Sequence, residues 1–314
     1  MIPALVLTAG FATRLRPLSR VRAKSALPVA GEPLVRHILR WLVGAGVTDA
    51  VLNLHHLPHT LTAALGDGAD LGLSVRYSWE VPILGSAGGP RRALPLIGAS
   101  RFIIANGDVL TNADLAAAVA HHERSDALVT LVLVPNTQPD RYGGVLVDSD
   151  GAVTGFSPRG AGMPSYHFVG VQVVEAETFA TLPDGEARES TSDLYPALIA
   201  ARPGSIRGHV CECLWHDIGT PRDYLTTALA LVQDADASPV ESRADIDASA
   251  VVRDTVLWSD VRIGARATLT RCVVTDGVHV PPGTSWQDET LRRADGELED
   301  GERRVGDLAV GLIP

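Results

Sequence analysis

A glycine turn followed by two cations lies within the first 24 residues and suits phosphate chemistry. The apolar run of residues 3–7 has the length of a strand, the chain turns at Gly10, and Arg14 and Lys24 follow closely. Glycine lets the backbone approach phosphates, exposed N–H groups donate to their oxygens, and cations offset the charge of phosphoryl chemistry. An ordinary strand-to-loop turn has the same appearance, so the spacing alone supports both interpretations.

Two aspartates follow strand-like runs and could bind a metal ion. Asp108 ends a run that begins at Phe102, and Asp217 lies just before Thr220 and Pro221. An aspartate that opens a turn is often only solvated, and Thr-Pro begins a helix well without a further role. Magnesium, however, prefers carboxylate oxygens and keeps waters and substrate phosphate oxygens as its other ligands. From the residues alone, both explanations stay open.

The elements that must position these groups alternate between strand-like and helical patterns from residue 2 to about residue 232. The expected strands are residues 4–7, 49–54, 73–77, 101–105, 127–134 and 167–174. The expected helices are residues 33–43, 59–65, 115–122, 192–201 and 221–232. Such alternation predicts an α/β fold with a mainly parallel sheet covered by helices on both faces. Functional groups should gather at the carboxyl ends of its strands.

Composition limits the classes of function. The 314 residues are 46% hydrophobic and 20% charged, with a net charge of −10, which argues against binding to nucleic acid or to an anionic membrane. The 3 cysteines are too few for a disulfide framework. No apolar run approaches the ~20 residues that span a bilayer, and the first run lacks a basic leader. A cytoplasmic location is therefore expected.

The last quarter of the chain has a different pattern. Residues 233–243 are small, polar and acidic, as in a linker, and apolar residues then recur every five or six positions across residues 244–285. This spacing predicts a short parallel β-helix of roughly two coils, which needs support from the main domain or from a second copy of the chain. An exposed β-helix edge would favour such a homo-oligomer. The charged residues 286–314 form a tail, and 288–304 are expected to be partly disordered.

Four motifs together resemble one enzyme family. They are Leu7-x-x-Gly10-x-Ala12-Thr13-Arg14-Leu15-x-Pro17 with Lys24 downstream, Gly85-Ser86-Ala87-Gly88, Asn106-Gly107-Asp108, and Trp215-x-Asp217-Ile218-Gly219-Thr220-Pro221-x-x-Tyr224. They are similar to the motifs of the sugar-1-phosphate nucleotidyltransferases (NDP-sugar pyrophosphorylases), with mannose-1-phosphate guanylyltransferase-like members closest. The resemblance extends to about residue 285 and implies a Rossmann-like domain, residues 1–232, followed by a short left-handed β-helix of the hexapeptide type.

The resemblance assigns roles to individual residues. Arg14 and Lys24 would be catalytic, and Asp108 and Asp217 would bind Mg²⁺. The implied nucleotide contacts are Leu7, Ala9, Gly10, Thr13, Glu80, Gly85, Ser86, Ala87 and Gly88. The implied sugar-phosphate contacts are Asn106, Gly143, Arg159 and Gly170.

Three positions depart from the family pattern. Ala12 replaces the usual second glycine and would be unfavourable if that position needs a positive φ. Ser25 replaces the proline that usually follows the lysine. The family's E-K-P segment is absent at residues 156–160, where Arg159 could supply the phosphate-binding charge.

The implied reaction joins a nucleoside triphosphate and a sugar 1-phosphate into an NDP-sugar and releases pyrophosphate. The general likeness favours GTP with mannose 1-phosphate or a related hexose phosphate. A UTP-dependent uridylyltransferase of a hexose or N-acetylhexose 1-phosphate is the alternative. Two other classes remain: a non-catalytic homologue that binds an NDP-sugar and regulates a partner, and an acyltransferase centred on the β-helix and His279.

Overall fold

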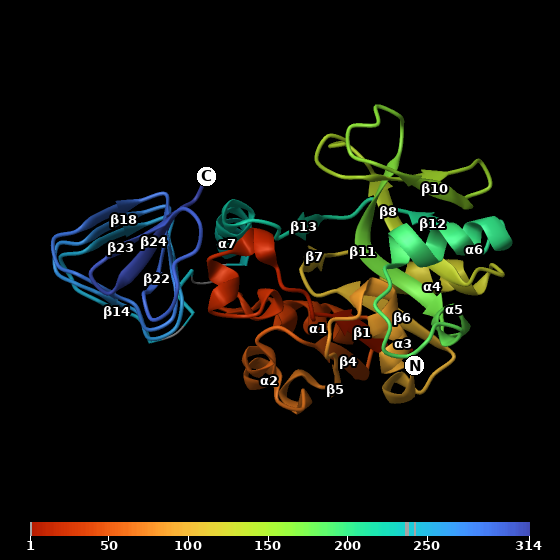
Figure 1. The fold of residues 1–314 in the computed structure, drawn as a ribbon, viewed down its shortest axis with the longest axis horizontal. Coiled ribbons are helices and arrows are strands. Elements are labelled where there is room, and N and C mark those ends of the chain that lie inside the picture. The colour runs from red at the N-terminus through yellow and green to blue at the C-terminus, as the bar shows by residue number, and fades with distance from the viewer. Residues whose placement is uncertain (1, 236–238, 242) are drawn as a thin grey trace. The chain divides into compact units, whose positions relative to one another are not determined.

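The computed structural model describes residues 2–235, 239–241 and 243–314 (Figure 1). The chain forms two compact units. One contains residues 1–10 and 37–216, and the other contains residues 11–36 and 217–314. The second unit therefore combines the segment of Arg14 and Lys24 with Asp217 and the C-terminal region.

A mixed, mainly parallel sheet forms the centre of the first unit. Its strand order is β10-β9-β11-β6-β1-β4-β5, with β8 beside β11 and β12 beside β8. The strands are β1 (Ala4–Leu7), β4 (Asp49–Leu54), β5 (Ser74–Trp79), β6 (Arg101–Asn106), β8 (Val129–Pro135), β9 (Gly144–Val147), β10 (Val153–Ser157), β11 (Tyr166–Glu175) and β12 (Ile206–Val210). β1 pairs in parallel with β4 and β6, whereas β11 runs antiparallel to β6 and β8. The predicted α/β class is confirmed.

Helices pack on this sheet through apolar side chains. They are α1 (Leu34–Gly44), α2 (Pro58–Leu65), α3 (Gly85–Ile97), α4 (Leu115–Glu123), α5 (Glu177–Ala180) and α6 (Tyr195–Ala201), the last preceded by a π-helical turn, Ser190–Leu194. Ala87 and Ile97 of α3 join Leu5, Val51 and Phe102 in one core cluster. The Asp114 carboxylate accepts a hydrogen bond from the Ala117 N–H at 3.0 Å and so begins α4. α3 runs for 13 residues although Pro90 and Pro95 lie inside it.

The second unit contains α7 (Pro221–Ala235) and a β-helix with three faces. One face stacks β14 (Asp245–Ile246), β17 (Arg262–Ile263) and β20 (His279–Val280) in parallel, so each coil advances 17 residues. The other faces are β15 (Val251–Arg253), β18 (Thr268–Thr270) and β21 (Ser285–Gln287), and β16 (Val256–Leu257), β19 (Val273–Val274) and β22 (Glu289–Arg293). Three strands stack on each face, which exceeds the two coils expected from the sequence.

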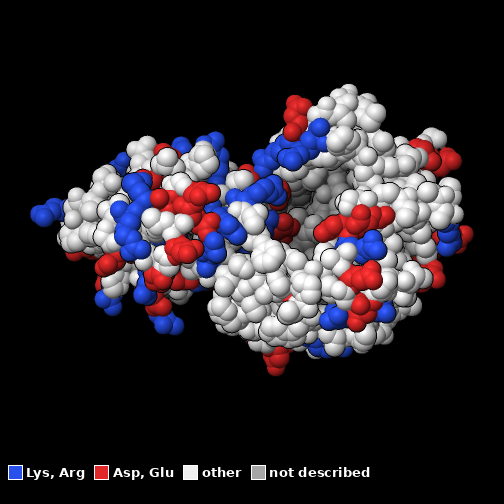
Figure 2. Space-filling model, in the orientation of Figure 1, with Lys and Arg blue, Asp and Glu red and all other residues white. Residues whose placement is uncertain are grey.

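The charged C-terminal residues form a hairpin instead of a partly disordered tail. β23 (Glu302–Val305) pairs with β24 (Leu308–Leu312), which also pairs with β22. The prediction of disorder at residues 288–304 is wrong because Arg292 and Glu302 are buried against each other, with side chains only 6% and 1% exposed. Charges of both signs gather on the face of this unit that Figure 2 shows. Among the described residues, no helix is long and apolar enough to cross a membrane.

Candidate active site

The segment that carries Arg14 and Lys24 folds into three short 3₁₀ turns, Thr13–Leu15, Leu18–Arg20 and Lys24–Ala26. Leu15 and Leu18 are buried and anchor it, whereas Thr13 and Arg14 are exposed. Ala12 has φ 49° and ψ 47°, the left-handed conformation in which glycine is preferred. Ala12, which replaces the family's usual glycine, therefore has a backbone conformation that its β-carbon disfavours.

The two cations meet Asp217 in the second unit. The Lys24 Nζ lies 4.0 Å from the Asp217 Oδ1, and both side chains are largely buried. Gly219 lies between these groups: a β-carbon there would come 3.5 Å from the Arg14 Nη1 and 3.4 Å from the Asp217 Oδ2. Of the predicted catalytic and metal-binding residues, the structure thus brings Arg14 and Lys24 beside Asp217 of the D-I-G-T-P string.

The residues that end the D-I-G-T-P string and begin α7 contact the segment that follows Lys24. The Thr220 Oγ1 accepts a hydrogen bond from the Asp223 N–H at 3.2 Å, which caps α7 as the sequence suggested. The hydroxyl of buried Tyr224 donates to the Pro28 carbonyl at 2.5 Å. Pro28 begins a small hairpin of β2 (Pro28–Val29) and β3 (Glu32–Pro33). Burial raises the pKa of Tyr224, so it stays a neutral donor.

In the first unit, a buried network of hydrogen bonds links the ends of three strands. The Thr8 N–H donates to the Asn53 Oδ1 at 2.6 Å, and the Asn53 Nδ2 donates to the Glu80 Oε1 at 2.7 Å. The other Glu80 oxygen accepts from the Leu84 N–H at 2.8 Å. Burial raises the pKa of Glu80, against the lowering effect of these hydrogen bonds.

Glu80 has a structural role in this network. Its side chain is 0% exposed and both oxygens accept hydrogen bonds, so it supports the loop before α3, and its nucleotide contact stays a prediction. Asn53 was missed by the sequence analysis. The only signal was a polar residue near the end of an otherwise apolar strand.

The start of α3 is held by the chain itself. The Ser86 N–H donates to the Glu189 carboxylate at 3.1 Å, and the Ala87 and Gly88 N–H groups donate to the Arg188 carbonyl at 2.9 and 3.2 Å. Ala87 is fully buried. These two N–H groups are therefore satisfied within the chain, and the nucleotide contacts of Ala87 and Gly88 stay predictions. The Glu189 carboxylate therefore lies against the first turn of α3.

The predicted sugar-phosphate residues Asn106 and Gly170 are in contact. Gly170 has φ 82° at a bulge of β11, and a β-carbon there would lie 2.8 Å from the Asn106 Nδ2. Asn106 ends β6 beside Leu7 of β1, and the Gly107 N–H donates to the Leu7 carbonyl at 2.9 Å. Asp108 follows in the turn before β7 (Val109–Thr111) and is partly buried. It belongs to the first unit, whereas Asp217 belongs to the second.

Three aromatic rings join motifs that are distant in the sequence. The His167 ring of β11 lies 4.5 Å from the Tyr142 ring and 4.2 Å from the ring of Trp215 in β13 (Trp215–Asp217), measured between centroids. Burial lowers the pKa of His167 to about 4, so this imidazole is neutral at pH 7. Flat aromatic surfaces with polar edges are common in pockets for small polar ligands.

The other two predicted sugar-phosphate residues are exposed. Gly143 follows Tyr142 of the aromatic group, and Arg159 lies in the turn after β10. The Gly160 N–H donates to the Pro139 carbonyl at 2.9 Å, which places this turn beside the loop that leads to Tyr142.

A groove of about 1020 Å³ lies on the β-helix, and none of the residues that line it is a predicted site residue. Its lining includes His279, Arg262 and Arg293, with four aspartates among the other lining residues. The acyltransferase alternative would use this groove, because His279 lies on its wall.

Comparisons with known proteins agree with the motifs. The model of the family described as "Nucleotidyl transferase" matches residues 3–234. The chain belongs to the nucleotidyltransferase family. A second model, described as "GlmU-like, C-terminal hexapeptide", matches residues 227–289, in agreement with the left-handed β-helix.

Individual members of this family are similar over much of the chain. The mannose-1-phosphate guanylyltransferase of Mycobacterium tuberculosis is 32% identical over 294 residues, 90% of this chain and 82% of that protein. The N-acetylmuramate alpha-1-phosphate uridylyltransferase of Neisseria meningitidis serogroup B is 36% identical over 223 residues, 69% of this chain and 93% of that protein. A solved structure, a putative glucose-1-phosphate thymidylyltransferase from Bacillus anthracis in complex with sucrose, shares the fold with a TM-score of 0.66 and 21% identity over 76% of this chain and 98% of that chain. This nucleotidyltransferase is therefore an enzyme of the sugar-1-phosphate group, and its specific substrates are a separate question.

Proposed function

We propose that this nucleotidyltransferase joins GTP and mannose 1-phosphate into GDP-mannose and pyrophosphate. The observation that carries the proposal is that Arg14 and Lys24 both lie beside Asp217, so that two cations flank a carboxylate that suits a magnesium ion. Such a site can bind a triphosphate and stabilise charge that builds up during transfer.

The reaction needs no side-chain nucleophile. An oxygen of the anionic sugar phosphate attacks the α-phosphorus of the nucleotide, and the bond from that phosphorus to the pyrophosphate oxygen breaks. Lys24 neutralises charge at the α-phosphate, and Arg14 holds the pyrophosphate end. Gly10 and Thr13 hold the triphosphate, with Leu7, Ala9, Gly85 and Ser86 beside the nucleoside. Asn106, Gly143, Arg159 and Gly170 hold the sugar phosphate.

The residues present suit Mg²⁺. Asp108 and Asp217 offer hard carboxylate oxygens on partly exposed side chains, and magnesium takes its remaining ligands from water and phosphate. When bound there, the ion would neutralise charge on the phosphates. Between substrates, Lys24 partly balances the Asp217 carboxylate, so this site keeps a compensated charge without the ion.

The choice of GTP and mannose 1-phosphate follows from the extent of similarity. The match to the mycobacterial guanylyltransferase covers 90% of this chain, whereas the match to the Neisseria uridylyltransferase covers 69%. UTP with an N-acetylhexose 1-phosphate is the second candidate, because identity over the shorter match is higher, at 36%. We further propose a cytoplasmic enzyme that can pair with a second copy and that binds neither nucleic acid nor membranes.

The test is pyrophosphate release from the purified chain with Mg²⁺, across GTP, UTP, ATP, CTP and dTTP and several hexose 1-phosphates. We expect release to be highest with GTP and mannose 1-phosphate and to stop on adding a chelator. Release confined to UTP with an N-acetylhexose 1-phosphate would establish the second candidate. The absence of release from every pair would overturn the proposed reaction.

A further inference from the structure

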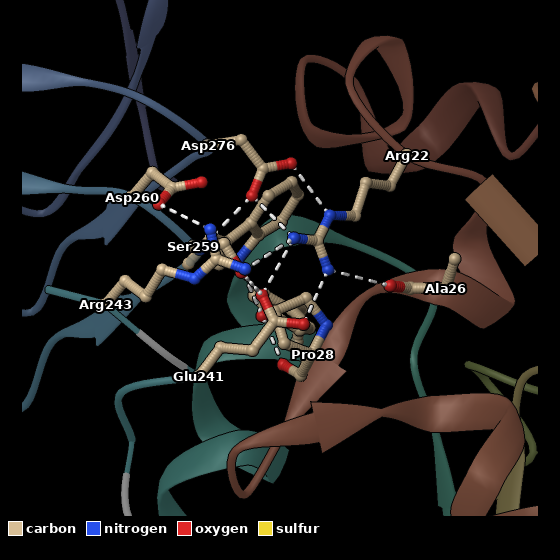
Figure 3. Close-up of polar contacts among 10 residues, drawn as sticks. Arg22, Ala26, Pro28, Glu241, Arg243, Ser259, Asp260 and Asp276 are labelled. Atoms are coloured by element: carbon tan, nitrogen blue, oxygen red, sulfur yellow. Dashed lines mark hydrogen bonds and ion pairs between the residues drawn. The ribbon is translucent and has the colours of Figure 1, made fainter. Parts of the chain in front are cut away.

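The segment of Arg14 and Lys24 carries another cation, Arg22, whose side chain extends to the β-helix (Figure 3). The Arg22 Nη1 and Nη2 donate to the two oxygens of Glu241, each at 2.8 Å. The Arg22 Nε and Nη2 donate to the two oxygens of Asp276 at 2.8 and 2.5 Å. One guanidinium thus makes two bidentate contacts, the geometry for which arginine is better suited than lysine.

The carboxylates and the guanidinium are themselves fixed. The Ser259 Oγ donates to the Glu241 Oε2 at 2.8 Å, and the Ser259 N–H donates to the Asp276 Oδ1 at 3.2 Å. The guanidinium carbon lies 5.2 Å from the centre of the Trp258 ring. We call Arg22, Glu241, Trp258, Ser259 and Asp276 the Arg22 cluster.

Burial sets this cluster apart from a solvent-exposed ion pair. The Arg22 and Glu241 side chains are 14% and 12% exposed. Burial alone would lower the pKa of Arg22, but the hydrogen bonds to Glu241 and Asp276 raise it above its ordinary value. The guanidinium therefore stays charged, and salt screens this partly buried cluster less than it screens exposed charges.

The Arg22 cluster contacts the chain on both sides of Lys24, the predicted catalytic lysine. Arg22 precedes Lys24 by two residues, and its Nη1 also donates to the Ala26 carbonyl at 3.4 Å, on the other side of Lys24. The same segment has a further attachment to the C-terminal hairpin, where Arg16 donates to Glu299 at 3.3 Å and Arg20 also pairs with Glu299. The 3₁₀ turn of Lys24 is therefore held against the β-helix from several sides.

We propose that Glu241, in the segment that leads into the β-helix, and Asp276 of the β-helix act through Arg22 as positioning residues for Lys24 and Arg14. The β-helix is then a working part of the active site and does more than stabilise the fold. This inference rests on the proposed function, since it assigns a role in the same reaction. A misplacement of about 1 Å in a catalytic group can cost on the order of 100-fold in rate.

The first test is kinetic and uses the full chain. Glu241→Gln and Asp276→Asn keep the side-chain volumes and remove the charges that orient Arg22. We expect kcat to fall at least about tenfold in the double variant, with KM for the sugar phosphate changed less than about threefold, at a temperature where all variants are folded. Arg22→Lys should lose a similar factor, because a single ammonium cannot make both bidentate contacts.

The control is Asp260→Asn. Asp260 follows Ser259 directly, and its carboxylate pairs with Arg243 at 3.6 Å on an exposed surface, where the Asp260 side chain is 60% exposed. We expect unchanged kcat in this variant. Unchanged kcat in the Glu241 and Asp276 variants as well, or full activity in Arg22→Lys, would overturn the inference.

The second test does not depend on activity. Amide hydrogen exchange of residues 13–27 should become at least about tenfold faster in the double variant than in the wild type and in Asp260→Asn. Equal exchange in all three proteins would contradict the positioning role. If the wild type lacks transferase activity while exchange rises as expected, the proposed reaction fails and the structural coupling stands, so the two failures are distinguishable.

Discussion

Gly170 lies so close to Asn106 that a β-carbon at position 170 would come within 2.8 Å of the Asn106 side-chain nitrogen. The two residues belong to β11 and β6, and both were assigned to the sugar-phosphate side from the sequence. The bulge at Gly170 therefore fixes the position of the Asn106 amide, and only glycine fits there without displacing it.

Gly170→Ala should impair both stability and turnover. The positive φ and the contact with Asn106 should together cost about 2–4 kcal/mol of unfolding free energy, measured by denaturant titration. Gly155→Ala is the control, because Gly155 lies in β10, has no positive φ, and would have no other atom within 4 Å of an added β-carbon. Its change should stay within about 0.5 kcal/mol. Equal losses in both variants would show that the contact with Asn106 is unimportant.

Ala12→Gly should stabilise the protein. Relief of the left-handed alanine gains about 1–2 kcal/mol, and the greater freedom of glycine in the unfolded chain costs about 0.5–1 kcal/mol, so a net gain near 0.5–1 kcal/mol is expected. Ala116→Gly, at an exposed position inside α4, should instead lose about 1 kcal/mol. Thermal unfolding of the two variants would measure the opposite signs. A loss in both would mean that Ala12 is unstrained.

The pKa of His167 predicts a loss of stability on mild acidification. The folded protein keeps this imidazole neutral down to about pH 4, whereas the unfolded chain takes up a proton near the ordinary pKa of 6.5. The unfolded state therefore gains as pH falls from about 6.5 to 4, at a cost to the folded state of up to about 3 kcal/mol. His167→Gln should flatten the pH dependence of unfolding free energy between pH 7 and 4.5.

The control for this pH effect is His59→Gln, since His59 is exposed. That variant should keep the wild-type slope of stability against pH. The same slope in all three proteins would exclude His167 as its source, whatever the loss of ring packing does to stability at pH 7.

The buried pair of Arg292 and Glu302 should be required for the C-terminal hairpin. Glu302→Gln leaves the Arg292 charge without its partner and should cost about 3–5 kcal/mol in urea unfolding. Asp295 pairs with Arg293 on the surface, and the Asp295 side chain is 65% exposed. The control Asp295→Asn should therefore change stability by less than about 1 kcal/mol. A cost below 1 kcal/mol for Glu302→Gln would show that the hairpin does not depend on this pair.

Local patterns in the sequence predicted much of the sheet. The bounds of β1 and β4 agree with the expected strands, because both are apolar runs ended by polar residues. The hairpin of β23 and β24 was missed since its exposed side chains are charged, and charge was interpreted as disorder. The apolar residues of β24, Leu308 to Val310, were the opposing signal.

The sequence singled out candidate site residues where a motif is contiguous, but not the contacts between distant residues. Lys24 and Asp217 are candidates that come from short strings. The partners Arg22 with Glu241 and Ser86 with Glu189 are separated by 219 and 103 residues, so only the tertiary fold brings them together. The burial of Glu80 was not predictable for the same reason, because it depends on contacts with Asn53 and Leu84.

Lys24 gives the most direct test of the proposed chemistry. The measurement is single-turnover formation of GDP-mannose from GTP, mannose 1-phosphate and Mg²⁺ by the wild type and by Lys24→Met, with circular dichroism to establish folding. Loss of one charge at the transferring phosphate should slow the reaction at least about 100-fold in a protein that remains folded. A folded Lys24→Met protein that forms product at the wild-type rate would contradict the assignment of the active site.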